Sequence, residues 1–90
     1  MLFMVIERFK NRDAVPVYRR YKEQGRMMPD GLKYVDSWVE SDFGRCFQLM
    51  ESDDPQLLRH WTKHWQDLVD FEIVSVVTSK EAAAAIASRL

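Results

Sequence analysis

The chain has little of several features that would narrow its chemistry. Its 90 residues include one cysteine, three glycines and three prolines. A single cysteine, Cys46, cannot form a disulfide within the chain, and a thiol in an apolar strand is expected to be buried and inert. The sequence contains no glycine-rich phosphate loop, no nucleophile elbow and no Cys–His pair at catalytic spacing. Common nucleotide-binding and hydrolase sites are therefore not predicted.

An excess of charge of either sign is also missing. The formal net charge is −1, so no strong basic field favours nucleic acid as a partner. The apolar stretch at residues 1–6 is too short to span a bilayer and lacks the basic flank and cleavage site of a secretory signal. We expect a cytoplasmic protein without a nucleic-acid or membrane partner. With 47% apolar and 30% charged residues, residues 1–90 are expected to form one domain with a modest core.

Hydrophobic periodicity predicts four strands and three helices. Branched and aromatic residues in short runs favour strands at 2–10, 32–41, 46–51 and 71–78. Helical spacing or propensity favours helices at 14–24, 56–68 and 80–90. The stretch from Cys46 to Leu68 (a strand, an acidic turn and a tryptophan-bearing helix) is the unit on which the other elements are expected to pack.

Turn and capping residues support these boundaries. Asp13 can cap the first helix, and Gly25 is suited to close it in the left-handed αL conformation. Asp53 or Asp54 can cap the second helix, with Pro55 in its first turn. The spacing of Thr78 and Glu81 is that of a capping box before the alanine-rich terminal helix. Pro29-Asp30-Gly31 predicts a turn, and the short connection containing Gly44 predicts a hairpin.

The order β-α-β-β-α-β, followed by a helix, is that of an α+β, ferredoxin-like fold. Such a fold has a four-stranded antiparallel sheet with strands one and three in the centre and both helices on one face. A sheet with one face in water should alternate apolar and polar residues, but Leu2–Ile6 is apolar throughout. The runs 47–50 and 73–77 are each interrupted only once. We therefore expect a second copy to cover the other face, sheet against sheet, in a homodimer.

The strand order, the apolar sheet and three segments resemble a small bacterial family known only as a domain of unknown function. The segments are Arg26-Met27-Met28-Pro29-Asp30-Gly31-Leu32, Ser37-Trp38-Val39 and Cys46-Phe47-Gln48-Leu49-Met50-Glu51. The resemblance covers nearly the whole chain and implies a homodimeric α/β barrel. It implies no catalytic residue. The broader class includes cofactor-free monooxygenases, haem-degrading enzymes, muconolactone isomerases and stress-response proteins, which share the fold and not the chemistry.

Polar residues within apolar strands are the first candidates for a site. Glu7, Gln48 and Ser75 occupy positions where an apolar side chain would cost less, and buried polar groups need partners. An enclosed Glu7 beside Tyr18 or Trp38 could act as a general base. The alternative is that Glu7 pairs with Arg8, Arg45 or a partner subunit. The arginines and lysines of the first helix and its following loop, with Arg26 among them, are expected to form a solvated face.

Aromatic residues and histidines complete the candidate set. Trp61 and Trp65 have the spacing of core residues, and together with other aromatics they could line a cleft between sheet and helices. His60 and His64 are four residues apart, but Lys63 stands beside them and no third ligand has metal-binding spacing, so no metal site and no cofactor are predicted. The predicted lining of the ligand pocket is Glu7, Tyr18, Trp38, Gln48, Trp61 and His64.

Three functional hypotheses follow from the sequence. The first is a small homodimeric protein that binds a small organic ligand between sheet and helices. The second is a cofactor-independent monooxygenase- or isomerase-like enzyme that uses Glu7 or His64 as a base. The third is a structural interaction module whose aromatic residues fill the cleft. The sequence leaves open whether the terminal helix packs on its own subunit or on the other.

Overall fold

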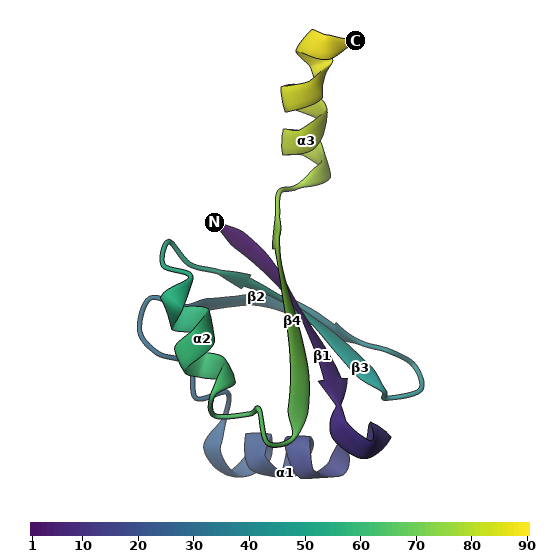
Figure 1. The fold of residues 1–90 in the computed structure, drawn as a ribbon, viewed down its shortest axis with the longest axis vertical. Coiled ribbons are helices and arrows are strands. Elements are labelled where there is room, and N and C mark those ends of the chain that lie inside the picture. The colour runs from purple at the N-terminus through teal and green to yellow at the C-terminus, as the bar shows by residue number, and fades with distance from the viewer.

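The computed structural model describes residues 1–90 and has the expected order of elements (Figure 1). The strands are β1 (Leu2–Phe9), β2 (Lys33–Val39), β3 (Arg45–Glu51) and β4 (Val69–Val76). The helices are α1 (Val15–Gln24), α2 (Gln56–Thr62) and α3 (Ser79–Ile86), with short 3-10 turns η1 (Lys10–Arg12) and η2 (Ala87–Arg89).

The four strands form one antiparallel sheet in the order β2-β3-β1-β4. This order confirms the ferredoxin-like α+β fold, with strands one and three in the centre. In the register of β1, Glu7 lies opposite Cys46 of β3 and Phe71 of β4. The pairing of β2 with β3 shifts by one residue between Tyr34 and Asp36, and this β-bulge decides which side chains of β2 face the helices.

Of the predicted capping residues, Thr78 is confirmed as the N-cap of α3, and its hydroxyl accepts a hydrogen bond from the Glu81 amide. Asp13 and Asp54 each stand one residue before the observed N-caps, Ala14 and Pro55, and accept hydrogen bonds from the amides of Val15 and Gln56. Gly25 ends α1 at φ 68° and ψ −159°, which is outside the predicted αL region. Only glycine adopts that conformation without strain, so the reason for a glycine here is conformational even though the predicted type of cap was wrong.

The second helix is shorter than predicted. It ends at Thr62, and the residues up to Leu68 continue as turns in which amides bond to carbonyls three residues earlier. The Trp65 amide, for example, donates to the Thr62 carbonyl at 2.9 Å. This tighter winding lies where the indoles of Trp61 and Trp65 converge on one backbone carbonyl, a contact that helical periodicity alone does not anticipate.

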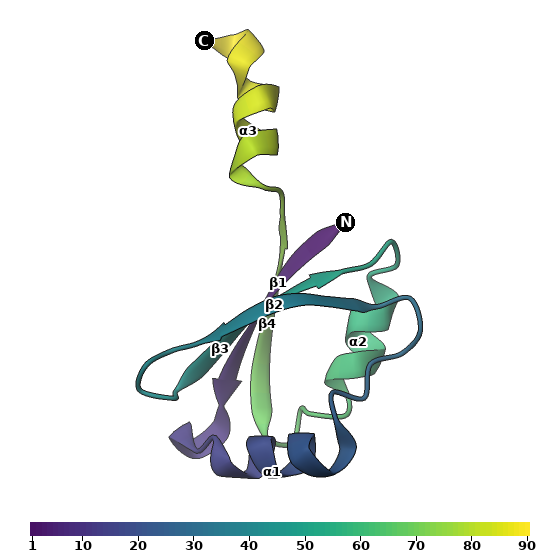
Figure 2. The same ribbon diagram turned by 180° about the vertical axis from the view of Figure 1, so that it is seen from behind.

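One face of the sheet carries the core. Alternate residues of β1 and β3 point to the side of α1 and α2 and are buried there, because successive side chains of a strand face opposite ways. The core consists of Phe3, Val5, Phe9, Val17, Leu32, Cys46, Met50, Leu58, Trp61, Trp65 and Val69. Figures 1 and 2 show both helices near the same end of the twisted sheet.

The opposite face, which we call the open face, has no helix over it. The register places eight large apolar side chains there, from all four strands, and all are half-buried or exposed: Leu2, Met4, Ile6, Trp38, Phe47, Leu49, Val74 and Val76. An apolar patch that draws on every strand of a sheet is unusual for a surface in permanent contact with water. The sequence-based expectation that both faces are apolar is therefore confirmed.

The terminal helix α3 stands away from the rest of the chain (Figures 1 and 2). It continues the line of β4, and its apolar residues Ile86 and Leu90 are exposed. The radius of gyration is 14.8 Å, compared with about 12 Å for a compact chain of this length. A helix of eight residues is marginal on its own in water. The α3 segment therefore has the form of an arm that lacks a packing partner within its own chain.

Candidate functional site

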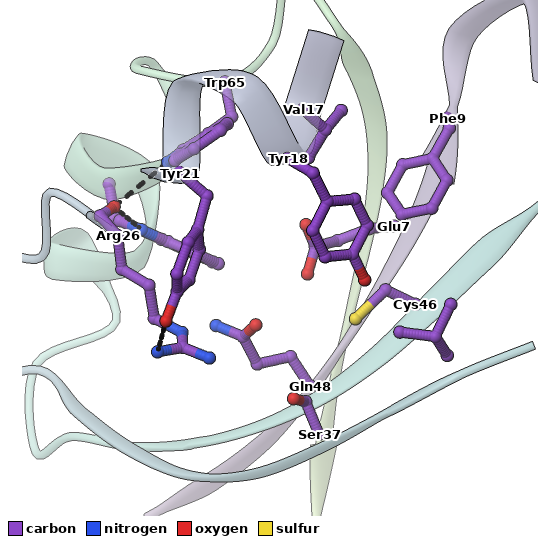
Figure 3. A pocket seen from close by; sticks show the side chains of 12 residues that line it. Glu7, Phe9, Val17, Tyr18, Tyr21, Arg26, Ser37, Cys46, Gln48 and Trp65 are labelled. Carbon is purple, nitrogen blue, oxygen red and sulfur yellow. Dashed lines mark hydrogen bonds between the residues drawn. The ribbon is translucent and has the colours of Figure 1, made fainter. Parts of the chain in front are cut away.

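A cavity of about 80 Å³ lies between the helix-covered face of the sheet, α1, α2 and the loop after α1. Figure 3 shows its lining side chains. They come from β1, β2, β3, both helices and the loop: Glu7, Phe9, Val17, Tyr18, Tyr21, Arg26, Ser37, Val39, Cys46, Gln48, Trp61 and Trp65. The space is large enough for several water molecules or a small organic molecule.

Glu7 lies at the centre of the sheet side of this cavity. It alternates with Val5 and Phe9 along β1, so the strand period that buries these apolar residues also buries the carboxyl group. Glu7 is only 8% exposed, and its Oε2 atom is buried without a hydrogen-bond partner. A buried polar atom without a partner is costly, and natural proteins keep few of them.

Burial raises the pKa of Glu7 from its ordinary value of 4.5 to about 7. The main cause is desolvation, which disfavours the charged carboxylate. A hydrogen bond from the Cys46 thiol and the positive charge of Arg26 act in the opposite direction and only partly offset it. The carboxyl group therefore changes its charge near neutral pH, in a cavity where few other groups do so.

The neighbours of Glu7 at this end of the cavity are poor acids. Burial raises the pKa of Cys46 to about 12, and the nearby Glu7 adds to this shift. The pKa of Tyr18 is also raised, first by desolvation and then by Cys46 and Glu7. Cys46 is thus a buried thiol that stays protonated beside Glu7, as the sequence predicted for an inert cysteine.

Arg26 forms the other end of the cavity. Its guanidinium carbon lies 3.8 Å from the ring centroid of Tyr34 and 4.9 Å from that of Tyr21, and it donates a hydrogen bond to the Tyr21 hydroxyl. The ion pairs of the chain do not include Arg26. Contacts with two rings hold the guanidinium in place, and most of its N–H groups have no protein partner.

Two tryptophans hold this end in place. The indole N–H groups of Trp61 and Trp65 both donate to the backbone carbonyl of Arg26, at 2.8 and 3.0 Å (Figure 3). The indole N–H donors therefore have hydrogen-bond partners, and the rings present apolar surface to the cavity. They also tie the loop after α1 to α2, so the position of Arg26 depends on both helices.

Four of the six predicted pocket residues line the cavity and two do not. Glu7, Tyr18, Gln48 and Trp61 come together there. Trp38 is on the open face and is 52% exposed, and His64 is exposed on the turn after α2. The β-bulge explains the first difference, because it places Ser37 and Val39 of β2 toward the helices and Trp38 away from them.

Two further expectations about polar residues were wrong. Glu7 makes no ion pair with an arginine, because Arg8 pairs with Glu72 and Arg45 pairs with Glu40. Ser75 is exposed, since it lies near the far end of the edge strand β4, whereas Val69 at the start of that strand is buried. The polar residues that the fold buries are Glu7 and Gln48, in the two central strands, and Ser52, directly after β3.

Arg26 and Tyr21 line the cavity, and neither was among the predicted pocket residues. The expected solvated basic face includes Arg26, whereas the structure places its guanidinium close to two tyrosine rings. A signal was present: Gly25 ends α1, so Arg26 belongs to a loop and does not continue the helix face. No pattern in the sequence indicates which ring an arginine in such a loop will contact.

No group of three His, Cys, Asp or Glu side chains lies close enough together to hold a metal ion. None of the helices combines the length and apolar character that a bilayer crossing requires.

Comparison with known proteins gives one match. The family model for a domain of unknown function, DUF3303, matches residues 1–90, and the chain belongs to that family. No curated protein and no solved structure matches the chain. The comparisons assign no activity, so the cavity must be interpreted from its own chemistry.

Proposed function

We propose that the protein is a homodimer that binds a small organic ligand in the cavity between sheet and helices. The observation that carries this proposal is the buried Oε2 atom of Glu7, which lacks a partner and belongs to a residue lining an open, mainly apolar cavity. Small-molecule sites typically combine apolar walls with a few converging polar groups. Glu7, Gln48 and Arg26 are such groups.

The unfilled cavity favours a ligand-binding protein over a purely structural module. A module without a ligand gains by filling its core with side chains, since each void costs stability. Here the side chains of Trp61, Trp65 and Tyr18 surround the space and leave it open. The cost of a buried carboxyl without a partner is also hard to reconcile with a role in stability alone.

The open face supports the homodimer. Its apolar side chains come from all four strands, including both central ones, and a second copy of the same face is self-complementary under two-fold symmetry. The detached arm α3 points to the same conclusion, because its exposed Ile86 and Leu90 also lack a packing partner. Association through this face leaves the cavity, on the other side of the sheet, accessible to a ligand.

A cofactor-independent enzyme is the second candidate, and the pKa of Glu7 favours it. A carboxyl group whose pKa is raised to about 7 can exist as a base at neutral pH and as an acid slightly below it. Only Glu7 fits this role, because the other candidate base, His64, is exposed and lies outside the cavity. Under this alternative, Glu7→Gln abolishes turnover and leaves the protein folded.

Native mass spectrometry of freshly purified protein, at low and then high collision energy, tests the ligand. We expect a dimer that carries a reproducible small adduct, which separates at high energy. A dimer without any adduct in repeated preparations, and without response to small-molecule libraries, would favour the structural module.

Sedimentation velocity of two matched variants tests the dimer. Phe47→Asp puts a charge in the middle of the open face, and we expect it to be monomeric at concentrations where the unaltered chain is dimeric. Phe43→Asp is the control, because Phe43 is 66% exposed in the hairpin between β2 and β3. A monomeric unaltered chain, or equal dissociation of both variants, would contradict the proposal.

A further inference from the structure

We propose that the ligand of this cavity is a small organic carboxylate that carries a carbonyl or hydroxyl oxygen at its other end. The carboxylate pairs with the guanidinium of Arg26, and the second oxygen accepts a hydrogen bond from the protonated carboxyl of Glu7. This inference rests on the proposed ligand-binding function and adds the chemical class of the ligand.

Each end of the cavity has polar groups with free hydrogen-bonding capacity. Arg26 has no carboxylate partner, and its guanidinium carbon lies 3.8 Å from the Tyr34 ring centroid, with N–H groups left over. A planar guanidinium matches a carboxylate in geometry as well as in charge. Gln48 lies between the two ends in Figure 3, with its amide group toward the cavity.

The two carboxyl oxygens of Glu7 can be assigned different roles. The Cys46 thiol lies beside this carboxyl group, while Oε2 is buried and has no partner. In a neutral carboxyl group one oxygen accepts and the other carries the proton. The simplest assignment gives the proton to Oε2, where it becomes a donor directed at the ligand. A ligand acceptor at that point satisfies the one buried side-chain atom that the chain leaves without a partner.

The balance of charge in the cavity favours a carboxylate ligand over an amine. A ligand carboxylate beside Arg26 with a neutral Glu7 leaves no net charge in the cavity. A cationic amine on an ionised Glu7 would leave the charge of Arg26 unpaired and close to a second cation. Uncompensated charge in a partly buried site is costly, so the amine is the less favourable ligand.

Charged and titratable groups around Glu7 are few. Cys46 faces it from β3, Tyr18 and Tyr21 line the same cavity from α1, and Arg26 does so from the loop after α1. Trp61 of α2 and Trp65 of the turns that follow it do not titrate. Because the thiol and the Tyr18 phenol have raised pKa values, Glu7 is the group whose charge changes near neutral pH. Binding of a carboxylate should therefore weaken as pH rises.

The indole N–H resonances of the three tryptophans give a direct readout by ¹H–¹⁵N NMR. Those of Trp61 and Trp65 report on the carbonyl of Arg26, and that of Trp38, on the other face, is an internal control. The probes are 4-hydroxybutanoate and 4-oxopentanoate, with 2-pentanone as a match that lacks the carboxylate and butylamine as a cation. We expect the two acids to shift the Trp61 and Trp65 signals at pH 6 and to leave Trp38 in place.

The expected affinities follow from the two contacts. For the acids, raising the pH from 6 to 8 should weaken binding about tenfold, because the neutral fraction of Glu7 falls by that factor. Glu7→Gln, which keeps an N–H donor and does not titrate, should remove this dependence. Arg26→Met should weaken the acids about tenfold or more and leave 2-pentanone unchanged. Arg26→Lys keeps the charge but lacks the planar guanidinium. Its affinity for the acids should lie between those of the unaltered chain and of Arg26→Met.

Several outcomes would overturn the inference. Butylamine binding more tightly than the acids, or acid binding that strengthens with pH, would assign the opposite charge to the ligand. Binding of 2-pentanone alone would refute the carboxylate class while supporting a ligand cavity. If no probe shifts Trp61 or Trp65 and the purified protein carries no adduct, the inference and the proposed function both fail. Unchanged indole signals in the unliganded variants show that Arg26→Met and Arg26→Lys remain folded.

Discussion

The two faces of this sheet have almost the same apolar content and very different surroundings. On the helix-covered face, Val5 and Met50 are fully buried by α1 and α2, and the polar Glu7 is buried with them. On the open face, the equally apolar Met4 and Leu49 meet no helix. Residue type therefore does not distinguish the faces. The covered face is the one that contains a buried polar residue, and it is also the one with the cavity.

The largest expected effect on stability comes from comparing a leucine in the core under the covered face with a leucine on the open face. Leu58 of α2 is 1% exposed, and Leu58→Ala should lower the free energy of unfolding by about 2–5 kcal/mol at every protein concentration. Leu49→Ala, on the open face, should cost about 1 kcal/mol or less in dilute protein and more where the dimer forms. Urea unfolding at two protein concentrations measures both. Equal losses for Leu49→Ala at high and low concentration would mean that nothing covers the open face.

A second effect, of similar or smaller size, concerns the buried carboxyl group. The pKa of Glu7 is about 7 in the folded chain, above its ordinary value of 4.5, so the folded state binds this proton more tightly than the unfolded state. The stability from the neutral group is complete below pH 4.5 and is lost as pH rises through 7, by up to about 3 kcal/mol. Glu7→Gln should flatten this dependence between pH 5 and pH 8.

A glutamate on the open face provides a control for the pH dependence expected from Glu7. Glu72 lies next to Glu7 in the same sheet region but on the open face, where it pairs with Arg8. Glu72→Gln should leave the slope of stability against pH between 5 and 8 nearly as it is in the unaltered chain. If Glu7→Gln and Glu72→Gln behave alike in urea unfolding across this range, the buried carboxyl does not control the pH dependence.

The smallest expected effect lies outside both faces, in the arm. Thr78→Ala removes the hydroxyl that caps α3 and should destabilise that helix by about 1 kcal/mol. In the Phe47→Asp background, the unfolding midpoint of the sheet and its two helices should not change, because α3 does not pack on them. Carbon chemical shifts of residues 79–86 measure the fraying. The neighbouring Ser79→Ala is the control, and a shifted midpoint would show that α3 packs on its own chain.

The fold could be predicted from the sequence because its signals are local and repeated. Alternating or continuous apolar runs, Gly25, Asp54 and Thr78 each mark an element or its end, and all agree with one topology. The exceptions have long-range causes. The end of α2 at Thr62 coincides with the convergence of two indoles on a carbonyl from another loop, which no local pattern reveals.

The cavity was only partly predictable, for a similar reason. Glu7 and Gln48 could be identified because a polar residue within a central apolar strand is anomalous in itself. Trp38 could not be placed, because the β-bulge in β2 reverses the faces of the strand and no glycine or proline marks it. Arg26 was missed because stacking on Tyr21 and Tyr34 depends on how α1, the loop and β2 meet.

The carbonyl of Arg26 accepts hydrogen bonds from indoles 35 and 39 positions further along the chain. Contacts across such separations form late, since closing a long loop costs entropy before the contact repays it. During folding, β1 and α1 can assemble early, but the Arg26 end of the cavity is fixed only when α2 arrives. A chain that has not yet reached residue 65 during its synthesis therefore already contains Glu7 and Arg26, but not both of the indole contacts that hold Arg26 at the cavity.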